Sequence, residues 1–493
     1  MRRLRIGLLG VLVCLGVGGS LAIADSWFPK KFIGVFEKKS KRVHTAWVFF
    51  REKSPAASRI PLVAEVLRRR WKAGFTRPDD RDVPVNPIYW KALEALGAKV
   101  RTTSRWFNAT SVKATEEQLA AIRILPFVLA VEEVRSGPRR RKERIAPAPK
   151  PVERHIVREE APAPEIPVYG LSQAQLDQIG VPALHQRGLT GKNVIVAIFD
   201  VGFKASHEAF RSANVRAAWD FVHGDGSVER NPNDPNDYDD KHGTMTWSVL
   251  GGNAPGYVVG PAYGATFLLA RTEDARSETP VEEDYWIAAL EWAEAQGADI
   301  VSSSLGYLKF DRPSDDHPYS SLDGQTLMIS RAANLAAQRG ILIVNSIGND
   351  GEKGEKTLSA PSDALGAFAV GAVNGKGELA AFSSQGPTAD GRIKPDVVAR
   401  GLRVVVATDG GYGQIDGTSF SAPLVAGAAA LLLEAHPDWT PDQVRYALTQ
   451  TASQADRPDN KMGYGIINAE KAVDCAVPRL IAASLNPEGD LLR

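Results

Sequence analysis

The sequence contains only two cysteines among its 493 residues, Cys14 and Cys475. Cys14 lies in an apolar N-terminal run with the pattern of a removable secretion signal, and its loss would leave Cys475 without a partner. The mature chain therefore cannot form an internal disulfide, although exported proteins commonly use them. A chain of this length can instead bury a large core, and we expect two folded units with tails.

The sequence also lacks an excess of charge of either sign, because 59 lysines and arginines face 58 aspartates and glutamates. The net charge of +1 favours neither nucleic acid nor an anionic membrane as a partner. One local exception is the basic run PRRRKER at residues 138–144. It contains a glutamate, has no aromatic residue on which bases could stack and is followed by proline-rich sequence. We predict a solvated, protease-accessible segment and no nucleic-acid partner.

The N-terminal apolar run is shorter than the roughly 20 residues that a membrane-spanning helix needs. It reads IGLLGVLVCLGV, follows three arginines and precedes Ala22-Ile23-Ala24, which is the three-part pattern of a secretion signal. We predict a signal peptide at residues 1–24, a secreted or periplasmic location, and no membrane contact after signal cleavage. An uncleaved membrane anchor is the alternative.

The sequence also has no internal repeat and no complete phosphate-binding loop. Changes in composition divide the chain after the predicted signal peptide into four parts. Residues 43–135 combine strand-like and amphipathic helix-like runs, which predicts a small α+β domain. Residues 136–167 are rich in proline and charge without periodicity, which predicts an extended, exposed linker. Residues 168–473 form the second folded unit, and residues 474–493 are too short for a further domain.

The second unit alternates apolar, β-branched runs with helix-like stretches. The runs are NVIVAIF, TFLLAR, DIVSSS, ILIVNS, FAVGAV and RVVVA, and several are separated by stretches such as VEEDYWIAALEWAEAQ. Continuously hydrophobic strands between helices are typical of an α/β domain with a doubly wound, mostly parallel sheet. In such a sheet, function gathers at the carboxyl ends of the strands.

Four polar residues follow predicted strands or begin predicted helices in this unit. Asp200 follows NVIVAIF, His242 stands in DDKHGTMTW, Asn349 follows ILIVNS in a glycine-flanked turn, and Ser419 lies in DGTSFSAP before a long apolar run. Each has an ordinary structural explanation, such as a turn or a helix cap. Their common placement in one α/β domain favours a shared chemical role.

The segments around these residues carry a family resemblance. In chain order, DVGFKASHEAF, HGTMTWSVLGG, SSSLG, SIGND and DGTSFSAP resemble the active-site blocks of the subtilisin-like serine peptidases. The resemblance implies a triad in which His242 is the general base toward the nucleophile Ser419, while Asp200 orients the imidazole. It also implies an oxyanion site made by the Asn349 side-chain amide and the Ser419 backbone N–H.

The same resemblance implies an edge that pairs with the substrate backbone as an added strand. Three residues form it: Ser304, Leu305 and Gly306. The blocks depart from the family pattern at residues 245–247 (Met-Thr-Trp), at Ser302 and at Val201. We expect the first departure to change packing behind the helix, the second to alter details of the substrate cleft, and none to remove a reacting group.

The first unit resembles the same family more loosely. The stretch WFNATSVKATEEQLAAIRILPFVLAVEEV resembles the inhibitory propeptide of subtilisin-like enzymes. The resemblance implies that residues 43–135 assist folding and cover the active site until they are removed. Processing would fall in the exposed linker, between about Gly137 and Pro167, and leave a fragment that begins near Val168. An unrelated accessory domain is the alternative.

Metal ligands cannot be assigned from the sequence. The loop GDGSVERNPNDPNDYDD offers five aspartates as oxygen donors suited to calcium: Asp225, Asp234, Asp237, Asp239 and Asp240. Acidic loops are more often solvated turns, and the family resemblance implies that any calcium is structural. We therefore assign no metal ligands and expect that no cofactor is required.

These observations predict a secreted serine endopeptidase that is made as a zymogen, acts on proteins or peptides and has its own propeptide as intramolecular inhibitor. Two alternatives from other functional classes stay open, a catalytically inert peptide-binding protein on the same scaffold and a general serine esterase. The complete four-residue site argues against the first. The sequence G-T-S-F-S around Ser419, in place of the G-x-S-x-G of an esterase, argues against the second.

Overall fold

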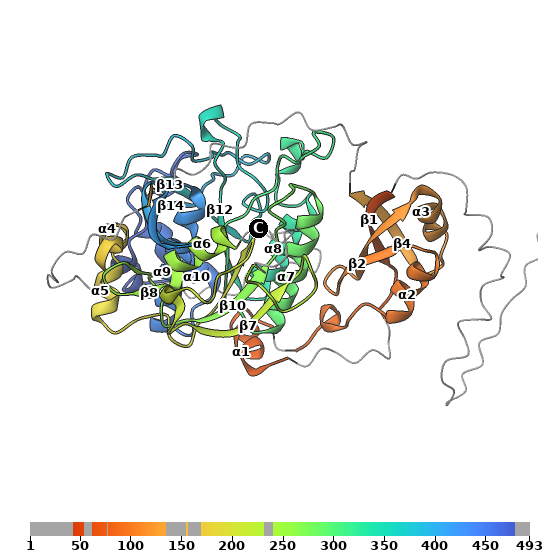
Figure 1. Ribbon diagram of the computed structural model, residues 1–493, viewed down its shortest axis with the longest axis horizontal. Helices are drawn as coiled ribbons and strands as arrows, with labels where there is room; N and C mark the ends of the chain where they lie inside the picture. Colours follow the sequence, from red (N-terminus) through yellow and green to blue (C-terminus); the bar gives the residue numbers. More distant parts are fainter. Residues whose placement is uncertain are drawn as a thin grey trace, which may run out of the picture.

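The computed structural model describes residues 43–53, 62–75, 77–134, 154–155, 169–230 and 240–478. The predicted signal peptide, most of the predicted linker and residues 479–493 of the predicted tail lie outside these ranges. Within them, the chain forms a large unit around a parallel sheet and a smaller unit around an antiparallel sheet, which lie side by side (Figure 1).

Seven parallel strands form the sheet of the larger unit, in the order β14-β13-β12-β11-β6-β10-β7. They are β6 (Ile195–Asp200), β7 (Asn214–Asp220), β10 (Thr266–Arg271), β11 (Ile300–Ser303), β12 (Leu342–Ser346), β13 (Ala367–Val373) and β14 (Val397–Arg400). Every residue of β6, β11, β12 and β13 is buried, as expected for a sheet that is covered on both faces.

Helices cover both faces of this sheet, and alternate residues of a strand pack against different helices. Val196 and Ile198 of β6 belong to a core shared with α6 and α9, whereas Ala197 and Phe199 pack with α7 and α8. The predicted doubly wound α/β domain is therefore confirmed. The helices of this unit are α4 (Gln173–Asp177), α5 (Val181–Gln186), α6 (Lys241–Gly251), α7 (Val281–Ala295), α8 (Met328–Gln338), α9 (Thr418–Ala435), α10 (Pro441–Gln450) and α11 (Ala469–Val473).

Helix α9 is apolar on every side, and all residues from Thr418 through Leu433 are buried. Its length and composition would allow it to cross a membrane, but 89% of its apolar window is buried inside the protein. It is therefore the core helix of the larger unit, as its sequence predicted. The N-terminal apolar run lies outside the described residues.

Several strands differ from the sequence-based expectation. The run RVVVA forms β15 (Val404–Thr408), which pairs antiparallel with β16 (Gly411–Ile415) and does not join the parallel sheet. Strands β7 and β14 were not predicted; β7 is an edge strand of mixed polarity, and β14 has only four residues. Residues 154–155 of the predicted linker form β5 (Arg154–His155), which pairs with β16. A short hairpin of β8 (Asn253–Ala254) and β9 (Val258–Val259) completes the larger unit.

The smaller unit is a four-stranded antiparallel sheet in the order β2-β3-β1-β4 with two helices, a β-α-β-β-α-β arrangement. Its elements are β1 (Val43–Phe50), α2 (Pro87–Ala95), β2 (Lys99–Ser104), β3 (Ala109–Thr115), α3 (Glu116–Arg123) and β4 (Val128–Val134). A further helix, α1 (Ala64–Lys72), and a 3-10 turn (Asp80–Asp82) are inserted between β1 and α2. The predicted small α+β unit is confirmed.

The two faces of this small sheet have different partners, because side chains alternate along a strand. Ala46, Val48 and Phe50 of β1 form a core with residues of α2 and α3, including Leu93 and Leu119. Trp47, which points to the opposite face, is 4% exposed and packs in the core that includes α7 and α8 of the larger unit. One face thus stabilises the small unit, and the other joins it to the large one.

Candidate active site

Asp200 is the last residue of β6, at the carboxyl edge of the parallel sheet. It is fully buried, and Oδ1 lies 2.7 Å from Nδ1 of His242 and accepts from the Val201 backbone N–H at 2.8 Å. Oδ2 accepts from the Thr246 hydroxyl at 2.9 Å. A buried carboxylate needs such partners, and together they fix its orientation toward the ring of His242.

His242 is the second residue of α6, and its side chain is 28% exposed. Gly243 permits the close approach of this helix to β6, because a Cβ there would lie 2.0 Å from the Gly202 carbonyl oxygen and 3.0 Å from the Asp200 Cβ. A carboxylate cannot donate, so Nδ1 donates to Asp200 and Nε2 is the nitrogen of the neutral ring that can accept a proton. The aromatic ring of Phe420 also lies near this imidazole, at 5.6 Å between centroids.

Ser419 is the second residue of α9 and is 7% exposed. Its hydroxyl donates to the Ser304 carbonyl at 3.3 Å, and the Ser304 hydroxyl donates to the Ser419 carbonyl at 2.8 Å. Gly417 precedes the helix with a φ of 153°, a conformation that favours glycine and permits the sharp entry into α9. Backbone N–H groups of a first helical turn point out of the helix at its positive end, so the Ser419 N–H can serve an oxyanion.

Asn349 lies three residues beyond β12 and is exposed. Its Oδ1 accepts from the backbone N–H and from the hydroxyl of Thr418, each at 3.0 Å. These two bonds fix the side chain beside the start of α9 and leave its NH₂ group as the donor end of the amide. Gly348, with a φ of 114°, forms the turn that precedes it.

The predicted substrate edge follows β11. Ser304 contacts Ser419, and a Cβ at Gly306 would lie 2.1 Å from the Ser359 hydroxyl, so a larger residue here would displace Ser359. A groove of about 500 Å³ runs beside the edge; its lining includes Ser304, Leu305, Gly306 and His242. The structure thus brings the predicted residues together at one end of the sheet. Asp200 bonds to His242, and the His242 ring lies near Phe420, the residue after Ser419. Asn349 bonds to Thr418, the residue before Ser419.

Thr246 and Thr418 are polar residues of this site for which the sequence predicted no role; Thr418 fixes Asn349, and Thr246 fixes Asp200. The expectation that residues 245–247 affect only the packing behind the helix is wrong for Thr246, because its hydroxyl bonds directly to Asp200. Met245 and Trp247 do lie in the hydrophobic core. The spacing of four residues from His242, which puts Thr246 on the same face of α6, was the signal that could have identified it.

The acidic loop that was considered for calcium is only partly described. Asp225 Oδ1 accepts from the Ser227 backbone N–H at 2.8 Å, and Asp240 Oδ2 accepts from the Arg230 backbone N–H at 3.2 Å. Asp234, Asp237 and Asp239 lie outside the described residues. These contacts are those of a structured turn, and they identify no calcium ligand.

Comparison with known proteins gives the site its context. A model of the subtilase family matches residues 191–465, and a model of the peptidase S8 propeptide domain of Bacteroidota matches residues 45–147. The chain belongs to the subtilase family. It is 32% identical to subtilisin E of Bacillus subtilis (strain 168) over 386 residues, which cover 77% of this chain and 84% of that protein. It is 34% identical to a subtilisin of Bacillus pumilus over 310 residues, which cover 62% of this chain and 98% of that protein.

The subtilase assignment confirms that this chain is a serine endopeptidase with an N-terminal propeptide domain. The large parallel unit is the peptidase domain, and the small antiparallel unit is the propeptide domain.

The propeptide domain of this subtilase docks on α7 and α8 through buried polar contacts as well as apolar ones. Trp47 Nε1 donates to Asp284 Oδ1 at 2.6 Å, and the Ser111 hydroxyl donates to Asp284 Oδ2. Glu291 of α7 accepts from the backbone N–H groups of Arg105 (2.9 Å) and Trp106 (3.2 Å). Each contact joins the propeptide domain to the peptidase domain.

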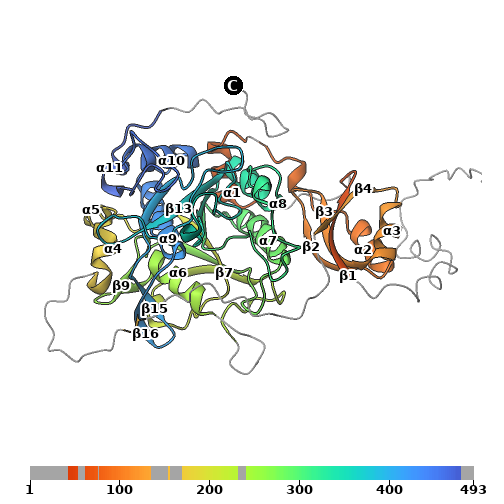
Figure 2. The ribbon, with the colours of Figure 1, turned by 90° about the horizontal axis from the view of Figure 1, so that it is seen from above.

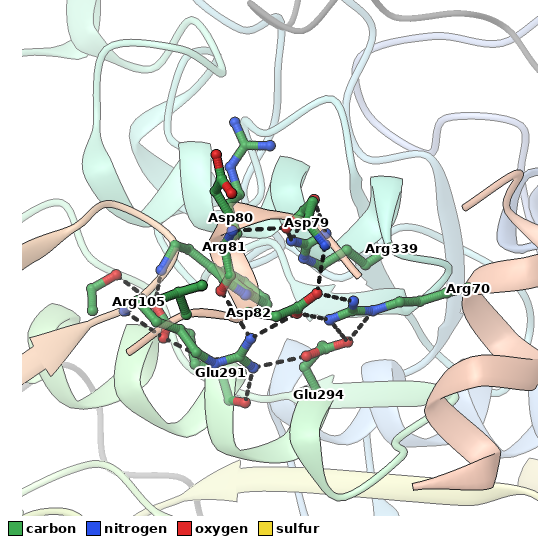
Figure 3. Close-up of polar contacts among 12 residues, drawn as sticks. Arg70, Asp79, Asp80, Arg81, Asp82, Arg105, Glu291, Glu294 and Arg339 are labelled. Atoms are coloured by element: carbon green, nitrogen blue, oxygen red, sulfur yellow. Dashed lines mark hydrogen bonds and ion pairs between the residues drawn. The ribbon is translucent and has the colours of Figure 1, made fainter. Parts of the chain in front are cut away.

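Glu294 of α7 is the centre of a buried charge network at this interface (Figure 3). It is 0% exposed and accepts from three propeptide-domain arginines: Arg69 (2.7 Å), Arg70 (2.8 Å) and Arg105 (2.7 Å). Arg70 also forms a bidentate pair with Asp82, at 2.8 and 2.6 Å. Buried charges are tolerated when they are paired in this way, so the network requires both domains.

Helix α1 contacts the peptidase domain away from the four-stranded sheet (Figure 2). Arg69 donates to the carbonyls of Ala298 and Arg339, and Glu65 pairs with Arg216 at 2.8 Å. Gly340 provides room, because a Cβ there would lie 3.0 Å from Arg69 Cγ. The propeptide domain therefore holds the peptidase domain at two places.

Proposed function

We propose that this subtilase is a secreted zymogen in which Asp200, His242 and Ser419 form the catalytic triad. The observation that carries the proposal is the 2.7 Å contact between Asp200 Oδ1 and His242 Nδ1, beside a serine in the first turn of α9. This contact orients the imidazole ring, keeps its proton on Nδ1 and leaves Nε2 as the nitrogen that accepts a proton.

The proposed reaction is acyl transfer. His242 Nε2 takes the Ser419 hydroxyl proton as the oxygen attacks the scissile carbonyl, and it then gives that proton to the leaving amine as the C–N bond breaks. A water molecule, deprotonated in the same way, attacks the acyl-enzyme and releases the carboxyl product. Asp200 stabilises the imidazolium in both halves of the reaction, supported by the donors at Val201 and Thr246.

The oxyanion of each tetrahedral intermediate is proposed to accept from the Asn349 NH₂ group and the Ser419 backbone N–H. Asn349 is suited to this task because Thr418 binds its carbonyl oxygen and so directs the amide dipole. The residues Ser304, Leu305 and Gly306 are proposed to pair with the backbone of a protein or peptide substrate. No metal or other cofactor takes part in these steps.

The propeptide domain is proposed to inhibit the peptidase domain until it is removed. Its contacts with Asp284, Glu291 and Glu294 favour a stable complex. Processing is proposed between about Gly137 and Pro167, where the proline-rich, charged sequence favours protease access. Residues 1–24 are proposed to be the export signal, which gives a secreted or periplasmic enzyme.

Labelling with a fluorophosphonate tests the triad. The label is expected on Ser419, and Ser419→Ala is expected to abolish labelling and casein cleavage while the circular dichroism spectrum is kept. His242→Ala is expected to lose nearly as much activity, because triad members act as a unit. Casein turnover by Ser419→Ala at the rate of the unchanged protein would refute the triad. A folded protein that neither takes the label nor cleaves casein would favour the alternative, an inert peptide-binding protein.

Mass spectrometry of the same two proteins tests the zymogen. If the enzyme cuts its own linker, the active protein shortens by its propeptide domain, whereas Ser419→Ala stays uncut after the signal is removed. An active enzyme that keeps residues 43–135 attached, and that added propeptide domain does not inhibit, would identify that unit as an accessory domain.

A further inference from the structure

A proline removes one backbone hydrogen bond from α9, at the residue that is the proposed nucleophile. In an α-helix the N–H of each residue donates to the carbonyl four residues earlier. The residue four positions after Ser419 is Pro423, which lies inside α9 and has no N–H. Its ring also crowds the carbonyl that the missing N–H would have reached. The Ser419 carbonyl therefore cannot make the usual bond along the helix.

Ser304 supplies the donor that Pro423 lacks. Its hydroxyl donates to the Ser419 carbonyl at 2.8 Å, an ordinary length for a bond between two oxygens. Both serines are 7% exposed, and a buried carbonyl without a donor would be unfavourable. Ser304 is the first residue after β11 and begins the proposed substrate edge. The bond therefore joins this edge to the backbone of the nucleophile.

The second bond between the two serines is longer. The Ser419 hydroxyl donates to the Ser304 carbonyl at 3.3 Å, beyond the usual range of about 2.5–3.0 Å for such bonds. This weaker bond can be exchanged for one to His242 Nε2, while the shorter bond continues to hold the Ser419 carbonyl. The pair thus fixes the main chain of Ser419 and still allows its hydroxyl to rotate.

The peptide unit that contains the Ser419 carbonyl also affects the surroundings of the proposed base. It continues into Phe420, whose ring lies 5.6 Å from the His242 imidazole between centroids. A shift of this unit would move the Ser419 side chain and the Phe420 ring together. Misplacement of a reacting group by about 1 Å can cost roughly a hundredfold in rate. A hydroxyl that holds this unit can therefore affect the rate without touching the substrate.

We infer that the Ser304 hydroxyl is a positioning group for Ser419, and that it replaces the backbone donor missing at Pro423. The inference rests on the proposed triad and deepens it. It gives the Ser304 side chain a role in addition to the proposed pairing of its backbone with the substrate. The side chain acts through Ser419 and keeps the nucleophile in a fixed position relative to the edge that holds the substrate backbone.

Peptide kinetics on Ser304→Ala test this role. Each variant is produced from the full-length chain, and titration with a fluorophosphonate counts its active sites. At a temperature where circular dichroism shows a fully folded protein, kcat per titrated site is expected to fall about tenfold with little change in KM. Ser303→Ala is the matched control, because it removes a buried hydroxyl one residue earlier that accepts from Trp286 of α7 at 3.0 Å. It should lower the melting temperature and keep kcat.

A second substitution, Pro423→Ala, separates positioning from general destabilisation. It supplies an N–H at residue 423 that can donate to the Ser419 carbonyl along the helix. Ser304→Ala should then reduce kcat by less than about threefold in the Pro423→Ala background, because the two donors share one acceptor and their effects do not add. Pro423→Ala alone is the reference for the double variant. If Ser304→Ala alone does not fold, Pro423→Ala is expected to restore both its folding and the labelling of Ser419.

Three results would overturn the inference and leave the triad intact, provided that the unchanged protein takes the label on Ser419 and cleaves casein. The first is an equal loss of kcat from Ser304→Ala in both backgrounds. The second is a Ser304→Ala enzyme with unchanged kcat, or with a change in KM alone. The third is a double variant that stays unfolded when Ser304→Ala does not fold. A folded unchanged protein that takes no label would refute the triad, and this inference with it.

Discussion

Thr246 and His242 lie one helical turn apart on α6, and both bond to Asp200, through Oδ2 and Oδ1 respectively. The carboxylate is therefore held by the same helix that carries the imidazole. This relationship makes Thr246 a positioning residue in the proposed mechanism, because it acts through Asp200 and not on the substrate.

Replacing Thr246 by valine keeps the shape of the side chain and removes its donor. A buried carboxylate oxygen that loses a partner costs about 1–3 kcal/mol, so we expect Thr246→Val to lower both the thermal stability and kcat. Thr246→Ser retains the hydroxyl and should recover most of kcat. Differential scanning calorimetry and peptide kinetics on the two variants provide the comparison. Equal loss of kcat in both would contradict a specific role of the hydroxyl and assign the effect to packing at this position.

Asn349 is predicted to act only on charge that develops in the transition state. Asn349→Ala should lower kcat by roughly 10²–10³-fold with little change in KM. Asn349→Asp is the sharper variant, because it keeps the acceptor for Thr418 and replaces the donor NH₂ by an oxygen. It should lose at least as much kcat. A change in KM alone would make Asn349 a substrate-positioning residue.

Glu294→Gln should weaken the binding of the propeptide domain strongly. The substitution leaves Arg69, Arg70 and Arg105 buried with less compensating charge, and breaking such a buried network typically costs about 3–5 kcal/mol, a Kd increase of more than a hundredfold. Glu65→Gln breaks a pair across the same interface whose members are about one-third exposed, so it should cost less than about 1 kcal/mol. Titration of the processed enzyme with isolated propeptide domain measures both.

Asp284 predicts how this binding depends on pH. Burial at the interface raises the pKa of Asp284 to about 6, against the opposing influence of Arg101 and of the bonds from Ser111 and Trp47. A carboxyl group whose pKa is raised in the complex takes up a proton on docking. Docking should therefore strengthen as the pH falls from about 6 toward the ordinary value near 4, by at most about tenfold in Kd per pH unit.

The variant Asp284→Asn should remove most of this pH dependence, since it keeps an acceptor for Trp47 and cannot titrate. Inhibition constants of the propeptide domain at pH 7, 6 and 5, for both proteins, measure the effect. Binding that weakens steadily from pH 7 to 5 in the unchanged protein would contradict the prediction.

The sequence predicted the parallel sheet well because β6, β11, β12 and β13 are buried on both faces and therefore read as continuous apolar runs. It missed β7, an edge strand whose side chains are mostly accessible, and it assigned β15 to the wrong sheet, because strand pairing is set by contacts distant in sequence.

The residues of the candidate site and of the domain interface also fall into those that the sequence predicted and those that it did not. Four site residues stand in short motifs that can be recognised from the neighbouring residues in the sequence: Asp200, His242, Asn349 and Ser419. The role of Thr246 depends on a contact 46 residues away, and the convergence of Arg69, Arg70 and Arg105 on Glu294 depends on contacts about 190 to 225 residues away. The convergence on Glu294 has no local sequence signature, and the only local signal for Thr246 is its spacing of four residues from His242.

Helix α1 gives the propeptide domain a second set of contacts with the peptidase domain, through Arg69 and Glu65. In the proposed zymogen, cutting the linker would leave both sets of contacts intact, so hydrolysis of the peptide bond and departure of the inhibitor would be separate events with separate rates. When either set of contacts breaks, the other keeps the propeptide domain close to the peptidase domain, and rebinding competes with full dissociation. The proposed zymogen would thus contain a delay: the enzyme would be fully cut and still inhibited, for a time set by two coupled dissociations and not by its own turnover.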